Sequence, residues 1–252
     1  MREVPPRPNA VIVIPLYKAA LSPGERQSLR QCLHVLAAYP IVLIKPHGLA
    51  ISSLLQEFPK LKVQSFDDRY FTSIDTYNQL MVSVAFYQTF GHYEYMLLYQ
   101  LDAYVFRDEL PLWCQKGYDY VGAPALETEA VDQLPAAEHE RYARALDTTR
   151  PVLNGGLSLR RIPSLIRYLR IYHFFYSAWP GNEDKLFSLD ARRLAPMKYF
   201  IRLPTWREAL FFSFEKSPAA SYALTGRQLP FGCHAWERYD PDFWVPFMPT
   251  NS

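Results

Sequence analysis

The chain of 252 residues lacks both glycine-rich and cysteine-based sites. It has 10 glycines against 21 prolines, and neither GxGxxG nor GxxxxGK[ST] occurs, which argues against a glycine-rich phosphate loop as the main binding device. The three cysteines show no CxxC spacing, so the sequence indicates neither a disulfide framework nor a thiolate zinc site. A reducing compartment fits such a set of cysteines best.

Long apolar runs and a strong net charge are also lacking. No apolar run approaches the roughly 20 residues that span a bilayer, and the first residues, MREVPPRPNA, lack the apolar core of a signal peptide. The net charge of +2 is too small to indicate nonspecific binding of nucleic acid. We therefore expect a cytoplasmic protein with no nucleic-acid partner, and peripheral contact with the inner face of a membrane stays open.

The chain does contain enough apolar and aromatic surface for a single core. Apolar residues make up 49% of it and aromatic residues 15%, which is globular composition with an unusual wealth of rings. Charge is unevenly distributed, with a balance of −4 before residue 150 and +6 from there on. The second part is therefore the better place for an anionic ligand or a membrane surface.

The order of apolar runs and amphipathic segments predicts an α/β fold. The run at 11–14 stops at Pro15 and is typical of a strand buried on both faces, and a capped amphipathic helix after Ser22 leads to a second run at 41–44. These segments form a βαβ unit. Further predicted elements are a strand at 61–66, a helix at 74–90, a strand at 95–99, an inserted polar loop or surface helix at 126–150, and a helix at 163–176.

Two clusters of candidate binding residues follow strands of the first half. Pro15, Tyr17 and Lys18 form a turn that can present backbone amides and a lysine to a diphosphate, or is an ordinary strand-to-helix turn. Gln100 and Asp102 follow a later strand, and the ligand crevice of open α/β sheets lies at the carboxyl ends of strands. The Asp102 carboxylate suits Mg²⁺ or Mn²⁺ as a hard ligand, or else caps its own turn.

A third cluster lies in the second half. Asn154, Gly155 and Gly156 let the backbone approach a ligand without interference from a Cβ atom. Glu183 and Asp184 follow the next helix and can return a carboxylate to the same pocket as a base. The simpler alternative is that this acidic pair begins another helix, where acids favour the positive end of the dipole.

The fourth cluster centres on His234, which stands between a glycine corner and a tryptophan. A neutral histidine there coordinates a metal or donates a hydrogen bond to a phosphate. Weaker candidates lie earlier, where Asp67 or Asp68 can accept a hydrogen bond from a base or ribose and Tyr77 and Asn78 can line the same cleft. Four arginines are expected either to meet an anionic acceptor or to lie on solvated helix faces: Arg160, Arg161, Arg192 and Arg193.

Eight motifs in order carry a resemblance to a known family. The chain resembles bacterial glycosyltransferase-like domains that are often encoded with surface-polysaccharide genes, through VIVIPLYK, FDDRYF, YNQLM, YQLDAYVF, GYDYVGAP, NGGLSLRR, NED and LPFGCHAW. The resemblance covers nearly the whole chain and implies one GT-A (Rossmann-like) α/β domain, with a central mostly parallel sheet flanked by helices. It implies a nucleotide-sugar half at about 10–125, the insert at 126–150 and an acceptor half at 151–252.

The resemblance also implies roles for the candidate residues. Asp102 falls at the metal or diphosphate site that GT-A enzymes build with a DxD motif, but Tyr104 stands in place of the second acid. Asp102 and His234 would then form a reduced site for Mn²⁺ or Mg²⁺, unless a lysine or arginine supplies the countercharge without metal. Asp184 corresponds to the base of inverting enzymes, which takes the proton of the acceptor hydroxyl, and Glu183 would orient the acceptor.

The sequence therefore predicts transfer of a sugar from a nucleotide-diphosphate donor to a glycan or lipid-linked glycan. The expected context is bacterial surface polysaccharide synthesis and the expected stereochemical course is inversion. Two alternatives stay open, namely a retaining mechanism and a binding module without turnover, which the incomplete DxD motif makes credible.

Overall fold

The computed structural model describes residues 8–126, 151–177 and 179–248, together with Glu138, Arg141 and Arg144. The polar insert predicted at 126–150 thus lies almost wholly outside the described residues. The helices are α1 (Pro23–Val35), α2 (Ser52–Glu57), α3 (Ile74–Met81), α4 (Val84–Thr89), α5 (Leu110–Gln115), α8 (Ile162–Phe175), α9 (Trp206–Leu210), α10 (Pro218–Leu224) and α11 (Pro241–Trp244). Short helical turns are η1 (Asp68–Phe71), η2 (Lys185–Leu189), η3 (Asp190–Arg192) and η4 (Met197–Tyr199).

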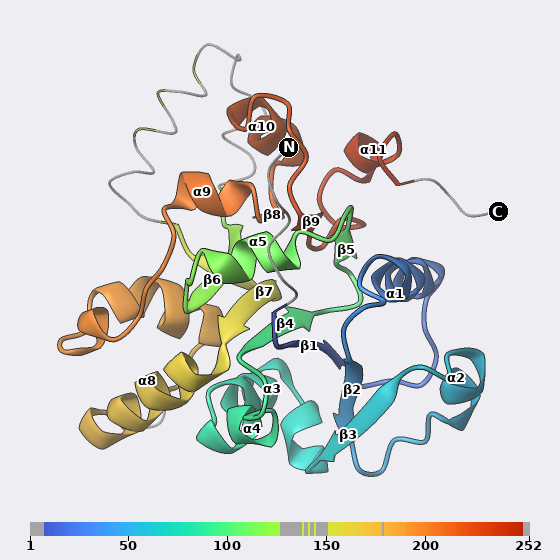
Figure 1. The fold of residues 1–252 in the computed structure, drawn as a ribbon, viewed down its shortest axis with the longest axis horizontal. Helices are drawn as coiled ribbons and strands as arrows, with labels where there is room; N and C mark the ends of the chain where they lie inside the picture. Colours follow the sequence, from blue (N-terminus) through green and yellow to red (C-terminus); the bar gives the residue numbers. More distant parts are fainter. Residues whose placement is uncertain are drawn as a thin grey trace.

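A six-stranded sheet forms the centre of the molecule (Figure 1). Its order is β3-β2-β1-β4-β7-β6, in which β1 pairs in parallel with β2 and β4, β2 pairs in parallel with β3, and β7 is antiparallel to both of its neighbours. The predicted α/β fold with a mostly parallel sheet is therefore confirmed. The strands are β1 (Ala10–Pro15), β2 (Ile41–Pro46), β3 (Lys62–Phe66), β4 (Tyr95–Tyr99), β6 (Tyr120–Pro124) and β7 (Leu153–Arg161).

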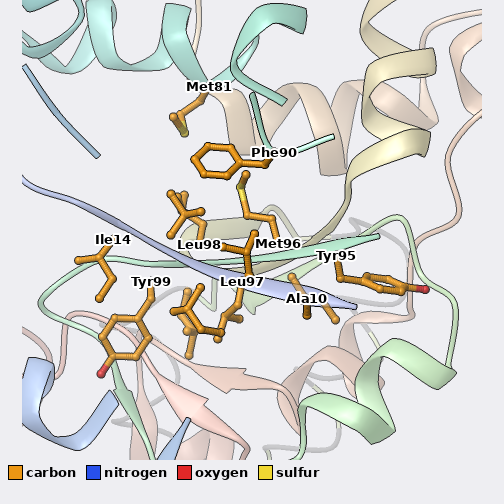
Figure 2. Close-up of a cluster of buried hydrophobic side chains, with 14 of the residues drawn as sticks. Ala10, Ile14, Met81, Phe90, Tyr95, Met96, Leu97, Leu98 and Tyr99 are labelled. Atoms are coloured by element: carbon orange, nitrogen blue, oxygen red, sulfur yellow. The ribbon is translucent and has the colours of Figure 1, made fainter. Parts of the chain in front are cut away.

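Helices cover both faces of the sheet, which is why its central strands are continuous apolar runs. Figure 1 shows α3, α4 and α8 on one side and α1 and α5 on the other. In the close-up of the core, Met96 and Leu98 of β4 point toward Phe90, beside α4 (Figure 2). Leu97 and Tyr99 point to the opposite face, where the Tyr99 hydroxyl donates to the backbone oxygen of Ser28 in α1. Each fully buried side chain of this size contributes about 1.5–3 kcal/mol.

The predicted helix at 74–90 is two helices, α3 and α4. The break falls at Ser83, whose hydroxyl donates to the Leu80 carbonyl and accepts from the amide of Phe86. Serine competes in this way with the regular hydrogen bonds of a helix, so it ends one helix and caps the next. The helix predicted after Ser22 is confirmed with its capping box, in which Ser22 and Glu25 bond reciprocally.

A second, three-stranded sheet stands beyond the carboxyl end of β4. It has the order β5-β9-β8, from β5 (Tyr104–Val105), β9 (Gly232–Cys233) and β8 (Ser213–Phe214). This sheet brings the segment around His234 back to the segment after β4, across more than 100 residues of chain. None of the helices in the described ranges is long and apolar enough to cross a membrane.

Candidate active site

One cavity of about 800 Å³ opens where β1 and β4 end and β7 begins. This is the crevice expected of an open α/β sheet. The structure brings to it every candidate site residue of the sequence except Asp67, Asp68 and the four arginines at 160, 161, 192 and 193. The candidates that line it are Pro15, Tyr17, Lys18, Tyr77, Asn78, Gln100, Asp102, Asn154, Gly155, Gly156, Glu183, Asp184 and His234.

His234 is the centre of a group of polar side chains in this cavity. Its Nε2 lies 3.2 Å from Oδ1 of Asp102 and 3.2 Å from Oε1 of Gln100, and its Nδ1 lies 3.3 Å from Oε1 of Glu215. Burial alone lowers the pKa of the imidazole, but the hydrogen bonds and charges of Asp102 and Glu215 outweigh burial and raise it to about 9. For Asp102, burial alone raises the pKa, yet His234 brings the net pKa below its ordinary value.

Glu215 is a site residue that the sequence analysis missed. It follows β8, is 5% exposed, and its Oε2 has no hydrogen-bond partner among the described residues. A carboxylate that contacts one ring nitrogen of a histidine orients the ring, so Glu215 turns Nε2 of His234 toward Asp102. The available signal was an acid directly after the apolar run FFSF. Ala235, which follows His234, has a φ of 51°, a left-handed conformation that is uncommon outside glycine.

The two glycines at the start of β7 leave space for neighbouring side chains. A Cβ atom on Gly156 would lie 2.0 Å from Nε2 of His234, and one on Gly155 would lie 2.2 Å from Oε1 of Glu183. Asn154 holds this segment through its Oδ1, which accepts from the amide of Gly156 at 2.7 Å. The absence of a Cβ atom at these two glycines therefore leaves room for the side chains of His234 and Glu183 beside the cavity.

Asp184 is the most perturbed carboxyl that lines the cavity. Burial, and then the charge of Glu183, raise its pKa to about 6. Its Oδ1 also accepts from the amide of Lys185 at 2.6 Å and so caps η2. Asp184 thus begins a helical turn, as the simpler interpretation of the sequence expects, and it also lines the cavity, while its role as a base stays a prediction.

Glu183 is fixed by a buried ion pair. Nη2 of Arg160 donates to Oε1 of Glu183 at 2.9 Å, and Nη1 donates to the hydroxyl of Tyr87 at 2.9 Å. The expectation that Arg160 lies on a solvated face or meets an anionic acceptor is wrong, because its side chain is fully buried. The reason is that β7 is an interior strand covered on both faces. Arg161, the next residue, is half-exposed and pairs with Glu94.

The turn after β1 contributes a lysine and an exposed tyrosine to the cavity. Nζ of Lys18 lies 2.9 Å from Oε2 of Glu25, and this hydrogen bond raises the lysine pKa. Tyr17 is 66% exposed at the edge of the cavity. The amide of Leu16 donates to Ile44 in the sheet, so it is not available to a ligand.

Asp67 and Asp68 bind the backbone of their own neighbourhood. Asp67 accepts from the amide of Arg69, and both oxygens of Asp68 accept from the amide of Gly48. Neither side chain lines the cavity. The carboxyl end of β3 lies at the edge of the sheet, two strands away from β1, and this distance separates them from the site.

Asn78 connects α3 to the acidic loop. Its Nδ2 donates to Oδ1 of Asn182 at 3.3 Å, and its Oδ1 accepts from the amide of Glu183 at 3.2 Å. Asn182 also lines the cavity and was not among the candidates. Tyr77, on the same helix, has a buried hydroxyl without a hydrogen-bond partner among the described residues. The asparagine pair therefore positions the carboxylates of the loop.

The charge of the cavity fits a bound cation. The basic side chains that line it are Lys18, Arg238 and His234. The acidic side chains outnumber them and are Glu25, Asp102, Glu183, Asp184 and Glu215. Within the described ranges, no group of three or more His, Cys, Asp or Glu side chains is arranged around one metal position. Nε2 of His234 and the oxygens of Asp102 and Gln100 nevertheless converge. A cation would have to displace the proton from Nε2, and the donor set then suits Mn²⁺ or Mg²⁺ with further oxygen ligands from a diphosphate. Tyr104 is buried in β5 and adds no ligand.

Comparison of the sequence with family models assigns the chain to a family. The model described as "Protein of unknown function (DUF5672)" matches residues 60–234, which include Asp102, Asp184 and His234. The chain belongs to the DUF5672 family. No match was found among curated proteins.

Solved structures resemble this DUF5672 protein in fold. The bifunctional glycosyltransferase WbbM matches with a TM-score of 0.52 and 13% identity over 93% of this chain and 47% of its own. An active-site mutant of LgtC matches with a TM-score of 0.51 and 12% identity over 89% of this chain and 86% of its own. The chain thus spans about half the length of WbbM. At these identities the likeness establishes a GT-A glycosyltransferase fold.

Proposed function

We propose that this DUF5672 protein is a glycosyltransferase that moves a sugar from a nucleotide-diphosphate donor to an acceptor hydroxyl. The observation that supports this most strongly is the convergence of Asp102, Asp184 and His234 on one cavity at the carboxyl ends of β1 and β4. The cavity is large enough for a nucleotide sugar. The division into a donor half at about 10–125 and an acceptor half at 151–252 belongs to the same proposal.

We propose that Asp102, His234 and Gln100 hold a divalent cation together with the donor diphosphate. The cation would supply electrostatic stabilisation of the departing diphosphate, which the acidic cavity by itself does not provide. Glu215 orients the imidazole from the far side, and the ion pair with Arg160 keeps Glu183 in place. Lys18 and Arg238 are the side-chain cations that line the cavity and can meet further phosphate oxygens.

Asp184 is the proposed base of an inverting displacement. Its pKa of about 6 leaves the carboxylate ionised at neutral pH but basic enough to accept the proton of the acceptor hydroxyl. The acceptor oxygen would form a bond to the anomeric carbon as the bond from that carbon to the diphosphate breaks. We place this reaction in bacterial surface polysaccharide synthesis, with a glycan or lipid-linked glycan as acceptor, as the sequence motifs imply.

The test is to measure donor binding and turnover separately. Thermal shift with nucleoside diphosphate sugars, with and without Mn²⁺, should show stabilisation by at least one donor, and donor hydrolysis should show turnover. Asp184→Asn should retain donor binding and lose turnover by about 10²–10⁴-fold, because the amide keeps the cap but accepts no proton. Asp242→Asn, at an exposed position on α11, is the control and should behave as the wild type.

Three outcomes would change the proposal. Donor binding without any hydrolysis or transfer would indicate a binding module that has lost turnover. NMR of the product shows its anomeric configuration, and retention of the configuration of the donor would indicate a retaining enzyme. Full activity of Asp184→Asn would remove Asp184 from the role of base.

A further inference from the structure

The face formed by the end of α8 and the following η4 region exposes large apolar side chains. Phe174 is 82% exposed, Phe175 is 57% exposed and Tyr199 is 75% exposed. The rings of Phe174 and Phe175 are in contact at 5.0 Å. Clusters of exposed large aromatic side chains usually mark a surface that binds another protein or a membrane.

The end of α8, which carries Phe174 and Phe175, packs beside η4, which carries Tyr199. The hydroxyl of Tyr176, at the end of α8, donates to the backbone oxygen of Ala195 at 2.6 Å, and α8 contacts η4 directly. Figure 1 shows the C-terminal end of α8 directed away from the central sheet. We call the surface made by Arg167, Arg170, Phe174, Phe175, Lys198 and Tyr199 the α8 face.

The α8 face is basic as well as aromatic. Arg167, Arg170 and Phe174 follow one another at three- and four-residue spacing, so they form a single exposed row along the helix. Neither arginine pairs with an acid anywhere in the described ranges. Residues 162–179 and 191–207 together carry seven lysines and arginines and no aspartate or glutamate.

We propose that the α8 face binds the surface of a membrane that contains anionic lipids. Basic residues beside exposed phenylalanines match such a surface in both charge and polarity, because the cations meet lipid phosphates while the rings enter the acyl boundary. Residues 162–179 and 191–207 contribute no acid that would repel lipid phosphates. This inference goes beyond the proposed function, since it assigns a partner to a surface outside the cavity.

The α8 face is connected to the cavity through a short loop. The rings of Tyr172 and Trp179 are in contact, and Nε1 of Trp179 donates to the backbone oxygen of Asn182, which lines the cavity. Asn182 is the seventh residue after Phe175, so their Cα atoms lie no more than about 25 Å apart. Docking of the α8 face would therefore hold Asn182, at the cavity, within about 25 Å of a residue in contact with the lipid surface.

Flotation with lipid vesicles tests the proposal. The wild-type protein should float with vesicles of phosphatidylcholine and phosphatidylglycerol in equal parts, stay behind with phosphatidylcholine alone, and dissociate as salt is raised. Arg167→Gln with Arg170→Gln should weaken binding about five-fold for each charge removed. Phe174→Ser with Phe175→Ser should weaken it at least as much, because both rings leave the acyl boundary.

Matched controls are available on other surfaces. Val245→Ser removes a 69% exposed apolar side chain, and Lys60→Gln with Lys62→Gln removes two exposed cations, and neither change should affect flotation. The α8 variants should keep the unfolding temperature and the donor binding of the wild type. Asp184→Asn should float normally, so loss of turnover and loss of membrane binding are separate results.

Several outcomes would overturn the proposal. These are absence of binding to the anionic vesicles, equal binding to both vesicles, or equal losses in the α8 variants and the controls. Sedimentation velocity provides a further test, because self-association that the Phe174 and Phe175 changes abolish would assign the α8 face to a second copy of the chain instead.

Discussion

Removal of the Arg160 charge should destabilise the fold far more than removal of its neighbour's charge. Arg160 donates to Glu183, Tyr87 and Ser158, and its guanidinium also lies 5.6 Å from the ring centroid of Tyr120. Arg160→Met keeps much of the volume but leaves the Glu183 carboxylate buried without its counterion. Breaking a buried pair in this way costs about 3–5 kcal/mol of unfolding free energy.

Urea unfolding followed by tryptophan fluorescence measures this cost. With a denaturant slope of about 2–3 kcal/mol per M, the midpoint of Arg160→Met should fall by about 1–2 M. Arg161→Met is the matched control on the same strand, since its pair with Glu94 is half-exposed and contributes about 0–1 kcal/mol. The double variant Arg160→Met with Glu183→Gln should be more stable than the sum of the single losses predicts. Equal midpoints for Arg160→Met and Arg161→Met would refute this account of the buried pair.

Three further predictions concern pH, packing and thiol chemistry. Turnover should rise with pH through about 6, as Asp184 loses its proton. The folded-state pKa lies above the ordinary value of 3.8, so the folded protein holds this proton more tightly and loses stability when Asp184 ionises. Asp184→Asn has no such proton to lose and should therefore be more stable than the wild type by up to about 3 kcal/mol at pH 8 but not at pH 4. Gly156→Ala should abolish Mn²⁺-dependent donor binding in isothermal titration calorimetry, because its Cβ displaces His234, and unchanged affinity would contradict the role of that imidazole. All three cysteines are buried, so iodoacetamide should label none of them until urea unfolds the chain, as mass spectrometry would show.

Local sequence patterns were sufficient to predict four of the six strands of the main sheet, β1, β2, β3 and β4, whereas β6 and β7 were not predicted. The run at 11–14 became β1 because four β-branched residues in succession fit only a strand covered on both faces, and the Ser22 cap placed the start of α1 correctly. The helix at 74–90 was wrong in one respect, since the bonds of Ser83 divide it. Apolar periodicity continues across such a break and does not reveal it.

The sequence also determined which residue types gather in the cavity, because most candidates lie at ends of elements: at the end of β1, after β4, at the start of β7, before η2 and after β9. Tertiary structure alone decided how their charges are balanced. Arg160 looks like any surface arginine in NGGLSLRR, and it becomes a buried counterion only because β7 is enclosed between two strands. Glu215 meets His234 only because β8 and β9 pair. Side-chain periodicity reports local burial, whereas the partner of a charge depends on segments that are distant along the chain, and only the folded backbone brings them together.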